Sequence, residues 1–481
     1  MNRRMILYMP LQILKVAAAV LLLPALVGLI YGETRHALVY LCVGAATFVL
    51  SVIGQRVVKP WTKVIYAREG FVIVALTWVL MSLVGALPFV ITGDIPNYVN
   101  ALFETMSGFT TTGASILTDI PAMSHANLFW RSFTHWLGGM GILVFVMAIS
   151  NMGDRSIHIM RAEIPGPIVG KLVPRARETA KILYLIYMGM TLLEVALLWV
   201  GKMPLFDCFI HAFGSAGTGG FSSQAASMGA YDSAYLQWVV TVFMFLFGVN
   251  FNIYYLILVK KIGQAVRSTE LRTYAAIAVI SAAAIAINIR SMYATLGETV
   301  RHAAFQVSSI LTTTGFSTTD FDRWPHFSRT VLVLLMFVGA SAGSTGGGLK
   351  VSRVMILFKS MHREIMRLLH PKSVRSLRLE GKKLDETVVH NTLNYFALYM
   401  LCFALCFLVV SVDQFNIETS LTATAACFNN IGPGLGAVGP TASYAGMTTL
   451  SKLTLTLAML LGRLEIFPVL LAVAPATWQR K

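Results

Sequence analysis

The stretch Leu311-Thr-Thr-Thr-Gly-Phe-Ser317 carries at its centre a Thr-Thr-Gly phrase that recurs along the chain. Related phrases end at Gly113, Gly220 and Gly432, so the four glycines are 107, 95 and 117 residues apart. Each phrase follows a short apolar segment and lies between two longer ones. Four copies at such intervals predict a structure built from one repeated helical hairpin.

The short segment before each phrase is expected to form a helix that enters the membrane and returns without crossing it. These segments are Ala101–Phe109, Asp207–Ala216, His302–Leu311 and Thr419–Asn429. The longer flanking segments are expected to span the membrane. They are Phe71–Ile91 and Phe129–Asn151, Ile182–Gly201 and Trp238–Lys260, Tyr274–Ile289 and Val331–Lys359, and Thr392–Val412 and Leu453–Trp478.

Two further apolar segments, Leu11–Tyr31 and His36–Val58, precede the first unit and carry no phrase. We therefore expect an all-α integral membrane protein with two leading transmembrane helices and four helix–pore loop–helix repeats. The repeats would surround a central pore in a pseudo-fourfold arrangement. The expected boundaries are 1–69 for the leading helices and 70–181, 182–272, 273–390 and 391–481 for the repeats.

The composition supports a membrane protein. Of 481 residues, 56% are hydrophobic and only 12% are charged, whereas soluble domains carry about a quarter charged residues. The mean hydropathy is +0.69. None of the five cysteines forms a CxxC pair, so no zinc site or disulfide framework is predicted.

The basic residues predict the orientation in the membrane. If the N-terminus is cytoplasmic, the inner segments hold 26 Lys and Arg residues, the outer segments eight and the helices four. This bias predicts cytoplasmic N- and C-termini by the positive-inside rule. It also accounts for most of the net charge of +16 without nucleic acid as a partner. Two inner loops, Asp154–Lys181 and Lys359–Lys383, carry fourteen of these basic residues and are expected to dock a cytoplasmic partner.

The repeated phrase predicts a site for a dehydrated cation. Backbone carbonyls replace the water of a cation when they face one axis, glycine permits the backbone angles required, and threonine hydroxyls could add further oxygens. A short helix whose C-terminal end faces the axis favours a cation there. The candidate ligands are Thr110, Thr111, Thr112 and Gly113; Thr218, Gly219 and Gly220; Thr312, Thr313, Thr314 and Gly315; and Asn430, Ile431 and Gly432.

The sequence resembles the Trk/Ktr/HKT superfamily of potassium transporters, and most closely the bacterial Trk-type membrane subunit. The residues that carry the resemblance extend over essentially the whole chain. They are Ser107–Gly113, Gly217–Ser222, Leu311–Ser317, Phe428–Gly434, Gly138–Gly141, Arg161–Pro167, Gly343–Gly348 and Gly462–Glu465.

The resemblance implies potassium as substrate, a selectivity filter formed by the four phrases, a homodimer in the bacterial inner membrane and a cytoplasmic nucleotide-binding ring subunit as regulator. No GxGxxG motif follows a strand–helix pattern here, so nucleotide sensing would belong to another chain. The chain departs from the pattern at Asn430 and Ile431, where the first and third phrases have threonines. Hydroxyl coordination is therefore expected to be uneven.

The second long segment of the third repeat contains five glycines within Gly339–Gly348. Each glycine costs a helix about 1 kcal/mol relative to alanine, so we expect the helix to break here. The resemblance implies a gating loop, although close packing through small residues remains an alternative. A phosphate-binding loop is excluded, because the spacing to the lysine does not match GxxxxGK[ST]. The gating candidates are Gly339, Gly343, Ser344, Thr345, Gly346, Gly347, Gly348, Lys350 and Arg463.

Arg463 lies between two apolar runs, where a central arginine costs roughly 2.5–3.5 kcal/mol on insertion scales. Glu465 is two residues away and is a poor partner, so carbonyls released by the broken helix are expected to accept from the guanidinium. The alternative is a purely structural clamp. Lys350 and Arg353 are expected to reach the cytoplasmic interface.

Other polar residues carry weaker expectations. Glu104, Asp207, Asp320 and Asp322 could attract cations at the outer mouth, with a solvated surface as the equal alternative. Gly138, Gly139 and Gly141 could permit a bend or close packing, with packing favoured. His135, His211 and His302 are interpreted as packing or interface residues.

Three other classes of function fit the sequence less well. A sodium- or proton-coupled symporter with alternating access commonly shows inverted repeats, whereas all four units here run in the same direction. A membrane enzyme is disfavoured because neither HExxH nor GxSxG is present. A purely structural membrane subunit would leave the four phrases unexplained. No cofactor is predicted.

Overall fold

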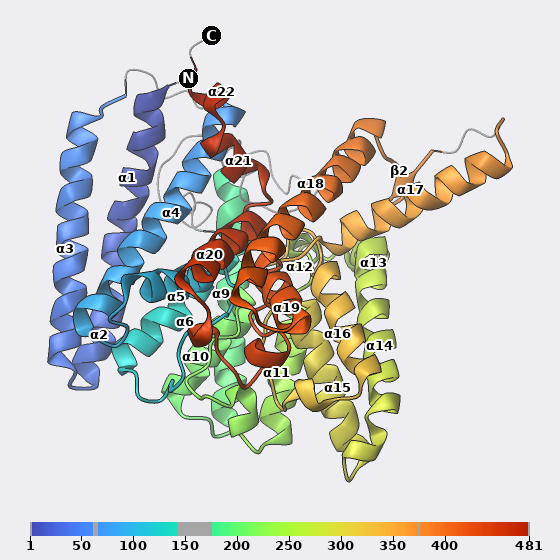
Figure 1. The fold of residues 1–481 in the computed structure, drawn as a ribbon, viewed down its shortest axis with the longest axis horizontal. Helices are drawn as coiled ribbons and strands as arrows, with labels where there is room; N and C mark the ends of the chain where they lie inside the picture. The colour runs from blue at the N-terminus through green and yellow to red at the C-terminus, as the bar shows by residue number, and fades with distance from the viewer. Residues whose placement is uncertain (1, 61–65, 142–175, 373–375, 480–481) are drawn as a thin grey trace.

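The computed structural model describes residues 2–60, 66–141, 176–372 and 376–479. Almost all of the secondary structure is helical, as expected (Figure 1). Among the described residues, six helices are long and apolar enough to cross a membrane, and two sharply bent helix pairs raise the number to eight. Their outward faces carry exposed leucines, isoleucines and valines, as expected of surfaces that contact lipid chains.

The leading helices form a hairpin at one side of the molecule (Figure 1). The first crossing consists of α1 (Arg3–Val20) and α2 (Leu22–Ile30), and the second is α3 (Thr34–Val57). The first crossing begins earlier than predicted, because the apolar face extends to Met5 and Ile6, which are buried. The side chain of Asn2 caps α1 by accepting from Met5 N.

The first two repeats each begin with a long helix followed by a short one. The first contains α4 (Ala67–Thr92), α5 (Tyr98–Phe109) and α6 (His125–Gly139). The second contains α9 (Ala176–Val200), α10 (Leu205–Gly217), α11 (Ala234–Phe247) and α12 (Phe251–Leu258). The short helices α5 and α10 begin a few residues before their predicted starts, since Asn97 caps α5 and Pro204 precedes α10.

The last two repeats follow the same plan. The third contains α14 (Thr269–Asn288), α15 (Leu296–Leu311), α16 (His326–Val338) and α17 (Val351–Leu369). The fourth contains α18 (Glu386–Val410), α19 (Ile417–Phe428), α20 (Thr449–Arg463) and α21 (Phe467–Val473). Short helices connect these elements: α13 (Ile262–Val266), α22 (Pro475–Trp478), and the single turns η2 (Ser227–Ala230), η3 (Arg290–Met292), η4 (Phe321–Arg323), η5 (Ser411–Asp413), η6 (Gly436–Val438) and η7 (Tyr444–Gly446).

Among the described residues, the helix at the start of the second long segment ends partway along that segment in each repeat. The break at Gly339–Gly348 is observed as predicted, since α16 ends at Val338 and α17 begins at Val351. The uninterrupted spans predicted at Trp238–Lys260 and Leu453–Trp478 are wrong. The chain bends by 92° between α11 and α12 and by 119° between α20 and α21.

These bends have local causes. Asn250 caps the new helix α12 through its side chain, and Pro468 occupies the first turn of α21, where its missing N–H costs nothing. In the first repeat, α6 ends at Gly139 and Gly141 adopts a φ of +88°. The glycines at 138, 139 and 141, for which close packing is the favoured prediction, therefore also mark the end of this helix. The rest of the predicted span Phe129–Asn151 lies outside the described residues, as do the motif Arg161–Pro167 and most of the loop Asp154–Lys181.

The repeats are arranged in a ring in chain order. Each second long helix packs against its own short helix and also against the short helix of the next repeat. Thus α6 contacts α10, α11 contacts α15, α16 contacts α19, and α20 closes the ring against α5. The four short helices are therefore held between the same kinds of neighbours around one axis.

A small antiparallel hairpin departs from the all-helical expectation. Strand β1 (Arg378–Leu379) pairs with β2 (Lys382–Lys383) on the side of the molecule where both chain termini lie (Figure 1). The termini are joined there, because Arg3 Nη2 donates to the carbonyl of Trp478 at 2.7 Å. Helix α17 projects from the same side.

Glycines at the ends of two second helices allow this ring to close, which generates a test. A Cβ at Gly138 would lie 1.8 Å from the carbonyl oxygen of Phe109, and one at Gly462 would lie 1.9 Å from that of Phe428. Gly138→Ala and Gly462→Ala should each destabilise the fold by about 1–3 kcal/mol, because the backbone must shift. Thermal unfolding of purified protein in detergent measures this loss.

The matched control is Gly189→Ala in α9, where a Cβ would meet nothing within 4 Å. This substitution should leave stability unchanged or raise it, since alanine favours a helix. Equal melting temperatures for all three variants would contradict the close packing of these helix ends.

Candidate functional site

The four phrases adopt one backbone conformation. In each, a residue with a left-handed φ is followed, two positions later, by a glycine that is also left-handed. The first positions are Thr111 (+55°), Thr218 (+55°), Thr313 (+61°) and Asn430 (+58°), and the glycines are Gly113 (+78°), Gly220 (+75°), Gly315 (+85°) and Gly432 (+95°). The intervening residues are not left-handed, and such alternation turns successive carbonyls towards the same side.

The left-handed threonine or asparagine ends the preceding short helix. The N–H of the next residue donates back to the carbonyl five positions earlier, at 2.8 Å in all four copies. This is the hydrogen bond of a Schellman motif, where glycine is the usual left-handed residue. The four donor and acceptor pairs are Thr112 and Ser107, Gly219 and Gly214, Thr314 and Ser309, and Ile431 and Ala426.

A β-branched residue in the left-handed region is strained, and such strain concentrates at functional sites. Here it redirects the chain at the C-terminal, negative end of each short helix. The sequence predicts Thr111, Thr218, Thr313 and Asn430 as candidate ligands, but it does not predict their left-handed conformation. The recurring Thr or Asn two residues before each glycine was the available signal.

The four glycines and their neighbours form a closed ring. A Cβ at Gly113 would lie 1.9 Å from the carbonyl oxygen of Gly219, in the next repeat. A Cβ at Gly220 would lie 2.1 Å from the carbonyl oxygen of Thr314, and one at Gly315 would lie 2.1 Å from that of Ile431. A Cβ at Gly432 would lie 2.7 Å from the carbonyl oxygen of Thr112. In every case the carbonyl belongs to the residue just before the next phrase's glycine. The predicted phrase residues are thus brought together around one axis.

Side chains support this ring unequally. Thr110 Oγ1 donates to the Met106 carbonyl at 2.6 Å and lies 2.8 Å from Thr112 Oγ1. Thr312 and Thr314 repeat this arrangement in the third copy, at 2.7 Å from hydroxyl to hydroxyl. These hydroxyls therefore brace the loops.

The second and fourth phrases lack this hydroxyl pair. Gly219 and Ile431 occupy the corresponding positions and have no hydroxyl. In the fourth copy, Asn430 Nδ2 instead donates to Thr112 Oγ1 at 3.0 Å and to the Met459 carbonyl at 2.9 Å. The unevenness expected from the sequence is therefore present in the hydroxyl pairs.

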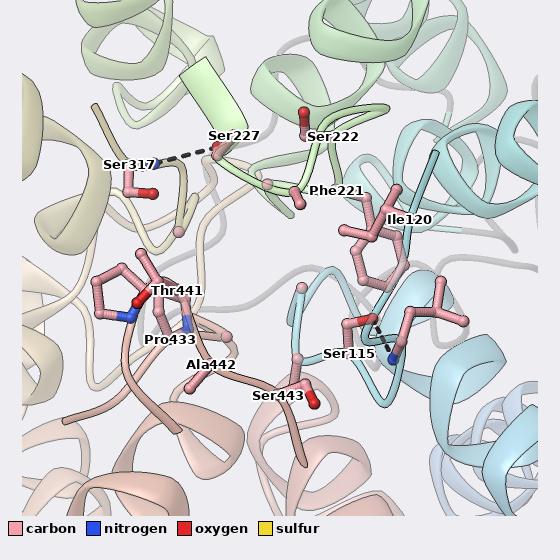
Figure 2. Close-up of a pocket in the computed structure, with 18 of the residues that line it drawn as sticks. Ser115, Ile120, Phe221, Ser222, Ser227, Ser317, Pro433, Thr441, Ala442 and Ser443 are labelled. Carbon is pink, nitrogen blue, oxygen red and sulfur yellow. Dashed lines mark hydrogen bonds between the residues drawn. The ribbon is translucent and has the colours of Figure 1, made fainter. Parts of the chain in front are cut away.

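A cavity of about 370 Å³ lies on one side of the ring and is lined by all four repeats. Figure 2 shows Ser115, Ser222, Ser317 and Ser443, one from each repeat, among the residues that line it. All four phrase glycines are among its lining residues. Among the described residues that line it, Arg131 is the one that carries a charge, and it is paired with Glu104.

None of the four acidic residues that could attract cations is among the described residues that line the cavity. The solvated alternative is wrong for Glu104, which is 1% exposed, lies 2.5 Å from Arg131 and accepts from Ser115 Oγ and Ile116 N at 2.9 Å. Glu104 therefore ties the chain after the first phrase to its own short helix. Asp207 accepts from Ser223 Oγ at 2.6 Å, while Asp320 and Asp322 pair with Arg323 and Arg329.

The broken segment of the third repeat lies on the opposite side of the ring from this cavity. A Cβ at Gly346 would lie 2.7 Å from the Thr312 carbonyl oxygen, and one at Gly347 would lie 2.3 Å from that of Asn429. Gly347 N also donates to Thr313 Oγ1 at 2.6 Å. The loop therefore closes directly against the start of the third and fourth phrases.

Arg463 joins this loop to the first repeat. Its guanidinium donates to the Thr345 carbonyl at 2.7 Å and to the Gly138 and Gly139 carbonyls at 2.6 Å. A weaker contact reaches Thr111 Oγ1 at 3.3 Å. The carbonyl acceptor expected in the broken helix is present, and the end of α6 supplies two further carbonyls that sequence reasoning did not assign.

The expectation that Lys350 and Arg353 reach the cytoplasmic interface is wrong. Lys350 is 1% exposed, and its ammonium group donates to the carbonyl of Gly346. Arg353 forms a bidentate pair with Glu465 at 2.7 and 2.5 Å and lies over the ring of Tyr395. This pair explains why Glu465 does not serve Arg463.

Comparison with known proteins identifies the family of this chain. The TrkH model, described as "Cation transport protein", matches residues 43–275 and 287–480. The chain belongs to the TrkH family of cation transport proteins. The family resemblance predicted from the phrases is thereby confirmed.

Relatives in the TrkH family match along the whole chain. "Trk system potassium uptake protein TrkH" of Salmonella typhimurium is 37% identical over 95% of this chain and 96% of its own. The protein of the same name from Halomonas elongata is 34% identical over 100% of both chains. The crystal structure of the potassium transporter TrkH from Vibrio parahaemolyticus superposes with a TM-score of 0.89, at 32% identity and with 100% of both chains covered.

The buried Glu104–Arg131 pair in this TrkH-family chain generates a prediction. Glu104→Gln and Arg131→Met should each destabilise the protein by about 3–5 kcal/mol, because each leaves one buried charge or its donors unpaired. The double variant should lose much less than the sum of the two. Thermal unfolding of the three variants measures the coupling, and an additive loss would show that the two side chains do not depend on each other.

Proposed function

We propose that this chain is a potassium uptake transporter in which the four phrases form the selectivity filter. The observation that carries the proposal is the closed ring in which each phrase glycine faces the carbonyl before the next phrase's glycine. The names of its full-length relatives, which are potassium uptake proteins, support the same substrate. Potassium is here the transported substrate and is bound by backbone oxygens.

The ring suits a weakly hydrated monovalent cation. Carbonyl dipoles replace hydration water without a fixed counter-charge, so binding is favourable enough to enter and weak enough to leave. The four short helices direct their negative ends at the same axis, which adds to the attraction. The cavity of about 370 Å³ would be the outer entrance, and its neutral, serine-rich lining leaves selectivity to the ring.

The loop Gly339–Lys350 would be the gate. It closes against the third and fourth phrases on the inner side of the ring, and Arg463 holds it to the end of α6. Lys350 adds a second buried cation to this region. A potassium ion leaving the ring would meet both the loop and these positive charges, so conduction requires the loop to move.

The surroundings of the protein follow from charge and shape. The side that carries both termini, α17 and the hairpin would face the cytoplasm of a bacterium, since it also carries the basic loop Lys359–Lys383. That face would dock a nucleotide-binding ring subunit. Helix α17 is strongly amphipathic and exposes Phe358, Met361, Ile365 and Leu368, which suits burial in a homodimer.

The first test addresses the filter. Gly113→Ser, Gly220→Ser and Gly315→Ser should weaken discrimination between potassium and sodium, because each new Cβ meets a carbonyl within about 2 Å. Gly432→Ser should have the smallest effect, since its nearest carbonyl oxygen is 2.7 Å away. Competition of sodium against rubidium uptake, in cells that lack their own potassium systems, measures the change.

The matched control for these variants is Gly93→Ser. Gly93 also has a left-handed φ of +93°, but a Cβ there would meet nothing within 4 Å. It therefore carries the backbone strain without the collision. Unchanged selectivity in all four phrase variants would refute the filter, and an equal loss in Gly93→Ser would attribute the effect to strain alone.

The second test addresses the gate. Deleting several residues of Ala342–Gly347 should raise rubidium flux, because the shortened loop no longer blocks the pore in the closed state. Arg463→Ala should act in the same direction but less, since it removes the clamp and leaves the loop in place. Flux into vesicles that contain equal amounts of protein gives the comparison.

A loss of flux in both variants, with protein that still reaches the membrane, would refute the gate. It would indicate that the segment is part of the conducting or structural framework. A rise confined to the deletion would assign Arg463 a structural role.

A further inference from the structure

The hairpin on the cytoplasmic face has an unusual turn. Residues Glu380 and Gly381 connect β1 and β2 and both are left-handed, with φ of +51° and +74°. A two-residue turn of this kind favours Asn, Asp or Gly at its first position. Glu380 is a strained choice there, which suggests that its side chain has a task outside the turn.

The Glu380 carboxylate binds the start of α14, more than a hundred residues away in sequence. Its Oε1 accepts from Ser268 Oγ at 3.0 Å and from Glu270 N at 2.9 Å. Ser268 is itself the N-cap of α14 and accepts from Leu271 N. A carboxylate at a helix N-terminus is favourable because unpaired N–H groups and the helix dipole meet it there.

The hairpin is also fixed to α17. Leu377, Leu379 and Leu384 are buried beneath it, and Lys359 Nζ donates to the Arg378 carbonyl at 2.8 Å. The hairpin is therefore attached to α17, the helix that follows the intramembrane loop, while Glu380 contacts α14, the helix that begins the same repeat.

Glu270 connects the hairpin to the intramembrane loop. Its backbone N–H is held by Glu380, and its side chain, 7% exposed, accepts from the backbone N–H of Ala342 at 2.7 Å. Ala342 lies in the loop between α16 and α17, where the backbone has lost its helical partners. Glu270 thus holds the loop three residues from Thr345, the residue whose carbonyl Arg463 binds.

We infer that Glu270 is a positioning residue for the intramembrane loop and that Glu380 transmits the position of the cytoplasmic hairpin to it through the first turn of α14. This inference rests on the proposed gating function of the loop. A partner that displaces the hairpin would withdraw Glu380 from α14, shift Glu270 and release Ala342. The loop would then have lost its attachment on the α14 side while Arg463 still held Thr345.

A cysteine at Ser344 reports the position of the loop independently of ion flux. Ser344 is 6% exposed and lies between the two attachment points. In vesicles that expose the cytoplasmic side, a charged methanethiosulfonate reagent should modify S344C slowly. Glu270→Ala should raise the modification rate about fivefold, the change expected from the loss of one hydrogen bond.

Conservative variants separate positioning from folding. Glu270→Gln keeps an oxygen that can accept from Ala342 N, so it should restore the slow rate. Glu380→Asn removes the reach to α14 but suits the turn, since Asn-Gly is the favoured pair. It should therefore raise the rate to a similar degree with an intact hairpin, and combining it with Glu270→Ala should add nothing further.

Glu364→Ala is the matched control, because Glu364 is an exposed acid on α17 that contacts Arg363 and Arg367 only at 3.8 Å. It should leave the rate unchanged. No rise with Glu270→Ala, or a rise that Glu270→Gln does not reverse, would overturn the positioning role. No rise with Glu380→Asn, or effects that add in the double variant, would overturn the transmission.

Rubidium flux in the same variants tests the two proposals separately. Faster modification with higher flux supports both the positioning role and the gate. Faster modification with unchanged flux keeps the positioning role and refutes the gate.

Discussion

The architecture depends on one constraint, which is that backbone N–H and C=O groups released inside a membrane have to find partners within the protein. The second helices α6, α11, α16 and α20 all end partway along their segments. Polar side chains from the same repeat or from another repeat bind carbonyls and amides that are freed there. Arg463 binds carbonyls of the first and third repeats. Glu270 and Thr313 accept N–H groups of the loop, and Lys350 donates to one of its carbonyls. These buried polar contacts hold the helix breaks around the ring.

The ring combines a fourfold backbone with unequal side chains. The left-handed pairs and the Schellman hydrogen bonds recur in all four phrases with nearly the same geometry. The hydroxyl pairs are present in the first and third phrases. In the fourth phrase, the Asn430 side chain instead donates to Thr112 of the first phrase. A carbonyl site needs only the backbone to be symmetric, so side chains are left available for other tasks. The long glycine-rich loop in the third repeat and the arginine in the fourth are such departures from symmetry.

Much of this could be predicted from the sequence. The four phrases, the short helices before them, the break at Gly339–Gly348 and an unusual environment for Arg463 all follow from local composition. Two bends were missed, at α11–α12 and α20–α21, because an apolar run of spanning length is the same signal whether the helix is straight or bent. Lys350 and Glu104 were misplaced for a similar reason. The sequence shows that a charged residue lies near a helix end or in a loop, but its burial depends on which residues pack against it in the folded protein.

The sequence by itself determined the repeated unit, the membrane setting and the residues of the four phrases, because periodic hydrophobicity and glycine placement are local properties. The repeat boundaries at 70, 182, 273 and 391 stay predictions. Only the tertiary structure decided the cyclic order of the phrases and the partners of Arg463, Glu270 and Glu380. Those contacts join residues from 72 to more than 300 positions apart. A guanidinium can donate to several equivalent backbone carbonyls and a carboxylate can accept from several equivalent N–H groups, and packing of the helices selects among them.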